Sequence, residues 1–183
     1  ASSSAEALQS ESHGNLIGFG SAPEGLENNE VVYELLADMG WTSQAIDLDK
    51  WMPSYCMARY GAYPETMKNA WDLFRKTAYS SLYSYPRFTW QTVIPDKRRI
   101  SKIDVSDDFL HGVELFLNSA DSLKNSKLYV NDAIEFASYY IAAKADKLYG
   151  KALAEDAVGR SAVAQQYLNQ TIDMLLNVDK LLA

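Results

Sequence analysis

The stretch that decides the fold is NLIGFGSAPEGLENNEVVYELLADMG, residues 15–40. Its first part, residues 15–20, is a short apolar run closed by glycines, which predicts a buried strand. A turn rich in proline and glycine follows and contains Glu24. From Val31 onward the apolar side chains recur at helical spacing, so the chain changes here from extended to helical.

Helical patterns bounded by caps and breakers account for most of the remaining chain. We expect six helices, at about residues 28–40, 47–60, 64–78, 106–123, 126–148 and 160–182. Residues 84–105 have no helical period, and a loop of that length is often functional. The predicted fold class is all-α, an array of about six bundle-like helices preceded by one extended strand or loop segment.

A single strand cannot satisfy its own backbone hydrogen-bonding groups. The predicted strand must therefore pair with a sheet supplied by further chain, or lie as an extended arm on the helices. We accordingly divide the sequence into residues 1–27, a flexible start that leads into the strand and its loop, and residues 28–183, a helical domain. Both ends of the sequence suggest that it is cut from something longer.

Composition excludes several classes of function. The formal net charge is −7, which argues against nucleic acid as a partner because phosphate backbones require a basic face. Cys56 is the only cysteine, so an internal disulfide and a cysteine-rich metal site are excluded. No apolar run reaches the roughly 20 residues that cross a bilayer, so no membrane span is expected.

Glu24 is the strongest candidate for chemistry. A carboxylate in a tight turn after an apolar strand and before a helix fits the position of a catalytic carboxylate at the carboxyl end of a barrel strand. The alternative is an ordinary glutamate in a surface turn, and spacing alone favours that alternative.

The wider segment resembles a known family. Residues 18–41 are similar to the pattern G-x-G-x-A-P-E-G, then N-E-V-V-Y, then a helix ending in G-W, which is typical of family 89 glycoside hydrolases, the α-N-acetylglucosaminidases. Residues 58–61 resemble the family's A-R-R-Y-G run, with Ala58 where that run often has an arginine, and residues 70–73 resemble its A-W-R-L helix. The specific motifs cover residues 18–79, under half of the chain.

The resemblance implies a role for Glu24 and a class of parent enzyme. Members retain anomeric configuration and use one glutamate as nucleophile and a second as general acid/base, and Glu24 matches the nucleophile. Residues 1–27 then hold the last strand and nucleophile loop of a TIM-like barrel, and residues 28–183 an incomplete carboxy-terminal helical domain. No part of the chain resembles the acid/base segment, so we expect the isolated fragment to be inactive.

Three further residues are candidates for contact with substrate. Asn29 and Tyr33 match the family pattern, although helix capping and core packing are the plainer roles for them. Trp90, in the long loop, offers a ring that can stack on a sugar, or that can pack under the loop instead.

The other polar candidates have structural explanations. We expect Glu30 to be a first-turn charge favoured by the helix dipole, and Arg59 to be an ion-pair partner at a helix end. His13 and His111 have no metal-ligand spacing, and we expect both at the surface.

The expected partners are a glycan with terminal α-linked N-acetylglucosamine and the remainder of the parent barrel, and no metal or organic cofactor is implied. The family's members are lysosomal in animals and secreted or periplasmic in bacteria. Two other interpretations stay open: a non-catalytic helical module for carbohydrate binding or interaction, and a related glycosidase of different sugar specificity.

Overall fold

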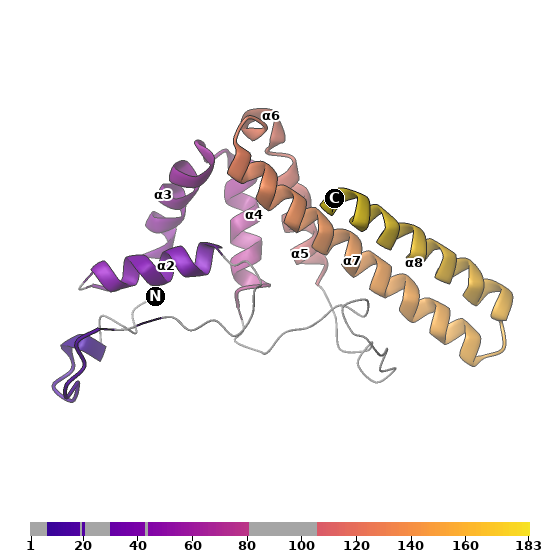
Figure 1. Ribbon diagram of the computed structural model, residues 1–183, viewed down its shortest axis with the longest axis horizontal. Coiled ribbons are helices and arrows are strands. Elements are labelled where there is room, and N and C mark those ends of the chain that lie inside the picture. The colour runs from indigo at the N-terminus through magenta and orange to yellow at the C-terminus, as the bar shows by residue number, and fades with distance from the viewer. Residues whose placement is uncertain (1–6, 19, 21–29, 43, 81–105) are drawn as a thin grey trace. The chain divides into compact units, whose positions relative to one another are not determined.

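The computed structural model describes residues 7–18, 20, 30–42, 44–80 and 106–183 (Figure 1). The chain divides into two compact units, Ala1–Arg59 and Tyr60–Ala183. The predicted all-α class is confirmed, because every regular element in the described ranges is a helix. Residues 81–105, which include most of the long loop predicted from the sequence, lie outside those ranges.

The strand predicted at residues 15–20 is not formed at the positions that the structure describes. Leu16, Ile17, Gly18 and Gly20 have no regular secondary structure, and the side chain of Ile17 is 98% exposed rather than buried. The physical reason is the one given by backbone hydrogen bonding: a strand forms only beside another strand, and the described residues offer none. The segment therefore fits the extended loop of the predicted fold class.

The first unit holds helix α2 (Glu30–Trp41) and most of helix α3 (Leu48–Tyr60). Asp47 begins α3, since its carboxylate accepts the N–H of Asp49 at 3.0 Å and its carbonyl accepts the N–H of Trp51 at 2.9 Å. Pro53 lies inside α3 without ending it, although proline cannot donate a backbone hydrogen bond there. Gly61, with φ of +89°, follows the last residue of α3, as the sequence predicted.

The second unit is built from helices α4 to α8 (Figure 1). Their bounds are α4 Glu65–Lys76, α5 Asp107–Leu117, α6 Ala120–Leu123, α7 Lys127–Ala157 and α8 Ser161–Leu182. Helices α7 and α8 lie side by side and antiparallel, joined by a short turn in which Gly159 takes φ of +76° (Figure 1). Helix α5 packs against both α4 and α7.

An aromatic cluster forms the core of the second unit. Phe116 of α5 lies with its ring centroid 4.8 Å from that of Phe136 and 5.2 Å from that of Tyr129, both on α7. Phe74 of α4 stacks on Phe136 at 4.7 Å, and Trp71 packs edge-on against Phe74 at 5.5 Å. Rings at these separations add directional contacts to the area that they bury, so this cluster orients α4, α5 and α7 together.

The helix predicted over residues 106–123 is two helices. Helix α5 begins where expected, with the Ser106 hydroxyl accepting the N–H of Phe109, but it ends at Leu117. The hydroxyl of Tyr129 donates to the carbonyls of Phe116 at 2.9 Å and Leu117 at 3.2 Å. These carbonyls at the end of α5 are satisfied by a side chain from α7, so the chain can turn before α6.

Helix α7 is longer than the sequence predicted. The expected helix ran from about residue 126 to 148, whereas α7 continues to Ala157 and passes through Gly150. A glycine inside a helix costs only about 1 kcal/mol relative to alanine, and the residues after it favour helix. Gly159, whose positive φ breaks the helical path, comes after the end of α7 instead.

Candidate functional site

Most of the predicted site residues lie outside the described part of the chain. They are Glu24, Asn29 and Trp90. Tyr33 is described: it lies on α2, and its side chain is 39% exposed. The described residues therefore do not bring the four predicted site residues together, and the site remains a prediction from the sequence.

The start of α2 is held by an ion pair from α3. Glu30 is the first residue of α2, and its Oε1 lies 3.8 Å from Nη2 of Arg59. The side chain of Arg59 is only 12% exposed, which reduces solvent screening of the pair. Both roles match the sequence prediction. The pair fixes the end of α2 that directly follows the Glu24 turn in sequence.

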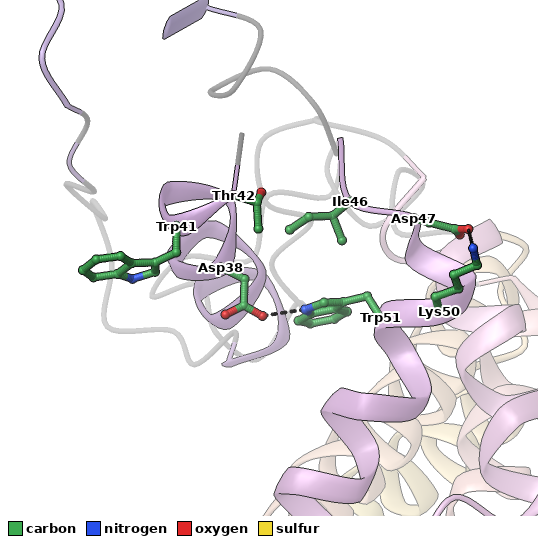
Figure 2. A pocket seen from close by; sticks show the side chains of 7 residues that line it. All are labelled: Asp38, Trp41, Thr42, Ile46, Asp47, Lys50 and Trp51. Atoms are coloured by element: carbon green, nitrogen blue, oxygen red, sulfur yellow. Dashed lines mark hydrogen bonds and ion pairs between the residues drawn. The ribbon is translucent and has the colours of Figure 1, made fainter. Parts of the chain in front are cut away.

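The described part of the first unit contains an open cavity between the end of α2 and the start of α3 (Figure 2). Its volume is about 390 Å³, and its lining is mostly apolar. The residues that line it are Asp38, Trp41, Thr42, Ile46, Asp47, Lys50 and Trp51. Figure 2 shows Asp38 between the two tryptophans, with Trp41 directed away from Trp51.

A short hydrogen bond crosses this cavity. The indole Nε1 of Trp51 donates to Oδ2 of Asp38 at 2.6 Å (Figure 2). One face of the Trp51 ring stacks on Tyr55, with centroids 5.0 Å apart and planes at 19°. Trp51 is thus held by α2 and α3 together, and the bond fixes the angle at which the two helices meet. The arrangement is a structural brace with an open rim.

The second unit offers a surface network instead of a pocket with polar groups. The Tyr140 hydroxyl donates to Oε1 of Glu114 at 2.7 Å, and Nδ1 of His111 lies 3.6 Å from Oε2 of the same carboxylate. The hydrogen bond from Tyr140 lowers the pKa of Glu114. Lys144 lies 4.7 Å from the centre of the Tyr140 ring, and its pKa is raised by its contact with Tyr140. The network joins α5 to α7 at the surface, where His111 lies as predicted.

A second cavity of about 280 Å³ lies among α5, α6, α7 and the end of α8. Its lining is almost entirely apolar, so it presents no group for acid, base or nucleophilic chemistry. Nowhere in the described ranges do three histidine, cysteine, aspartate or glutamate side chains gather as metal ligands. The helices in those ranges include none that is both long and apolar enough to span a membrane.

Comparison with known proteins places the chain. The family model described as the α-N-acetylglucosaminidase (NAGLU) C-terminal domain matches residues 51–183. The chain belongs to this family. A second model, the α-N-acetylglucosaminidase (NAGLU) TIM-barrel domain, matches residues 1–43, so α2 falls within the barrel match and α4 to α8 within the C-terminal domain.

Relatives of this chain are much longer than it is. Human α-N-acetylglucosaminidase is 29% identical over 181 residues, which cover 92% of this chain and 22% of the human protein. The chain thus spans about a fifth of the length of that relative.

Solved structures show the same fold. A family 89 glycoside hydrolase from Clostridium perfringens, in complex with 2-acetamido-1,2-dideoxynojirimycin, aligns with a TM-score of 0.63 over 80% of this chain and 18% of its own. A variant of the Clostridium perfringens enzyme in complex with GlcNAc-α-1,4-galactose aligns with a TM-score of 0.69 over 87% and 19%. Both are 23% identical to this chain.

Sequence reasoning missed the brace between Asp38 and Trp51. The two residues are 13 positions apart and are separated by an irregular loop, so no helical spacing links them. The only available signal was a pair of acidic and aromatic side chains at facing helix ends.

Proposed function

We propose that this chain is part of a retaining glycosidase that removes terminal α-linked N-acetylglucosamine from glycans, with Glu24 as its nucleophile. The observation that carries the proposal is the G-x-G-x-A-P-E-G segment, placed directly before a helix that begins at Glu30 in a chain of the α-N-acetylglucosaminidase family. The glycan in the substrate complex of the Clostridium perfringens relative, GlcNAc-α-1,4-galactose, supports the substrate class.

The chemistry needs two carboxyl groups about 5–5.5 Å apart across the glycosidic bond. Glu24, ionised, attacks the anomeric carbon and forms a glycosyl-enzyme ester. The second group first protonates the departing oxygen and then activates water. This chain supplies only the first group, and the second belongs to barrel segments upstream of the match at residues 1–43. The chain by itself is therefore expected to be inactive.

The remaining candidates are given supporting roles. Asn29 and Trp90 are proposed to contact the sugar, and Tyr33 to support the pocket from the first turns of α2. The ion pair between Glu30 and Arg59 holds the helix on which that support rests. In a barrel, the helix after a catalytic loop runs back to the opposite face, and α2 has 12 residues, so the cavity at Asp38 lies away from the reaction.

The test uses the full-length polypeptide that carries this chain, with an aryl α-N-acetylglucosaminide as substrate. Glu24→Ala should abolish turnover, and added azide should restore product release as a glycosyl azide of inverted configuration. Glu27→Ala, three residues further along the same turn, is the matched control and should keep turnover near that of the unsubstituted enzyme. Normal turnover by Glu24→Ala would remove Glu24 from the reaction.

A second measurement tests the isolated 183-residue chain. Purified chain should release no aryl group from the same substrate at any concentration. Turnover at a rate proportional to the concentration of the chain would show that a complete catalytic pair lies within it. For the compartment we propose secretion or the periplasm for a bacterial parent and the lysosome for an animal parent, which fractionation of the source cells would check.

A further inference from the structure

Helix α2 has three distinct sides, which follow from its sequence and its burial. One row of side chains four residues apart, Val31, Leu35 and Met39, is packed into the first unit, with Val31 and Met39 buried. A second row is acidic throughout and contains Glu30, Glu34 and Asp38. Side chains four apart share one face of a helix, so these rows are continuous stripes.

The third side of α2 is apolar and open. It consists of two neighbouring rows, Val32, Leu36 and Gly40, and Tyr33, Ala37 and Trp41. Within it the side chain of Val32 is 41% exposed and that of Trp41 is 91% exposed, while Leu36 is half-buried. No charged residue interrupts the six positions. Helix α2 is thus apolar on two sides, and only one of them is covered within the first unit.

A helix that is apolar over most of its circumference is typical of a buried helix. An exposed tryptophan in a charge-free stripe marks a surface that another apolar surface covers. The small residues Ala37 and Gly40 lie between the larger side chains, where they let a flat surface approach the helix axis closely. A β-sheet offers such a surface, because its side chains stand at right angles to it.

We propose that the open side of α2 is the seat of the β-sheet of the barrel domain. The occupant follows from two observations. Residues 1–43, which include all of α2, match the barrel-domain model, and this chain covers only 22% of the length of the human relative. In a barrel of alternating strands and helices, each helix packs one apolar face on the sheet. The inference rests on the family assignment and is independent of the role proposed for Glu24.

Cysteine labelling of two neighbouring positions on α2 tests this. Ala37→Cys places a thiol on the open side, and Glu34→Cys places one on the acidic stripe of the same helix. The native Cys56 is fully buried and provides a quiet background. Labelling with iodoacetamide is measured in the isolated chain and in the full-length polypeptide that carries it, after circular dichroism has shown that both variants are folded.

In the isolated chain both thiols should react at similar rates. In the full-length polypeptide the thiol at position 37 should slow by about 100-fold, the protection expected of a packed face, while that at position 34 changes little. Equal rates at position 37 in the two proteins would overturn the proposal. Protection of position 37 in the isolated chain that is lost on dilution would assign the surface to a second copy of the chain, which would also overturn it.

Discussion

Replacing Gly112 with alanine tests the closest packing in the second unit, where α5 meets α4. A Cβ at this position would lie 2.9 Å from Cε1 of Phe74 and 3.2 Å from Cβ of Leu73. Phe74 is fully buried and stacked on Phe136 at 4.7 Å, so its ring has no room to move aside. Overpacking of this kind costs about 1–3 kcal/mol, whereas alanine gains about 1 kcal/mol over glycine in a helix. We expect a net loss of about 1 kcal/mol in the free energy of unfolding.

Gly150→Ala is the matched control. Gly150 lies inside α7, and a Cβ there would meet no atom within 4 Å. This variant should gain about 0.5–1 kcal/mol from helix propensity alone. Urea unfolding followed by circular dichroism measures both variants, and the difference between them, about 1–3 kcal/mol, is the steric cost at position 112. If Gly112→Ala were stabilised as much as Gly150→Ala, the close packing of α5 on α4 would be refuted.

Three further predictions concern hydroxyl groups in the second unit. Tyr60→Phe removes the hydrogen bond of 2.7 Å to the buried carboxylate of Asp132 and should lower the free energy of unfolding by about 1.5–3 kcal/mol in denaturant titrations. Burial raises the pKa of Tyr129 to about 12, so this residue should be the last tyrosine to ionise in ultraviolet titration; its contribution to stability is complete below pH ~10 and is lost as pH rises toward 12. The lowered pKa of Glu114 contributes stability above its ordinary titration range that is lost as pH falls through the lowered value, and Tyr140→Phe should move its NMR titration midpoint upward.

Helix positions in this chain follow largely from local chemistry. Ser106 and Ser126 cap α5 and α7 at the predicted starts, and Gly61 follows α3, because caps and left-handed glycines act on their immediate neighbours. The break after Leu117 could not be predicted in this way. It depends on the hydroxyl of Tyr129, which is 12 residues further along the chain and reaches back only once α7 is packed.

The candidate site shows a similar division. The positions of Glu30 and Arg59 at helix ends could be predicted from spacing and charge, but their mutual contact depends on the angle between α2 and α3. That angle is set in part by the bond between Asp38 and Trp51, two residues with no sequence signature. Glu24, Asn29 and Trp90 stay predictions from the family pattern, and Tyr33 is located on α2 without a sugar to contact.

The sequence alone determined the helical class, the helix starts and the family, because these depend on residue periodicity, on capping groups and on a contiguous motif at residues 18–41. Tertiary structure alone decided which apolar side of α2 is covered and which is open. Helical periodicity marks a side chain as apolar but does not say which neighbour will bury it. Only packing separates the buried Val31 from the exposed Trp41, and that difference identifies the surface proposed to receive the barrel sheet.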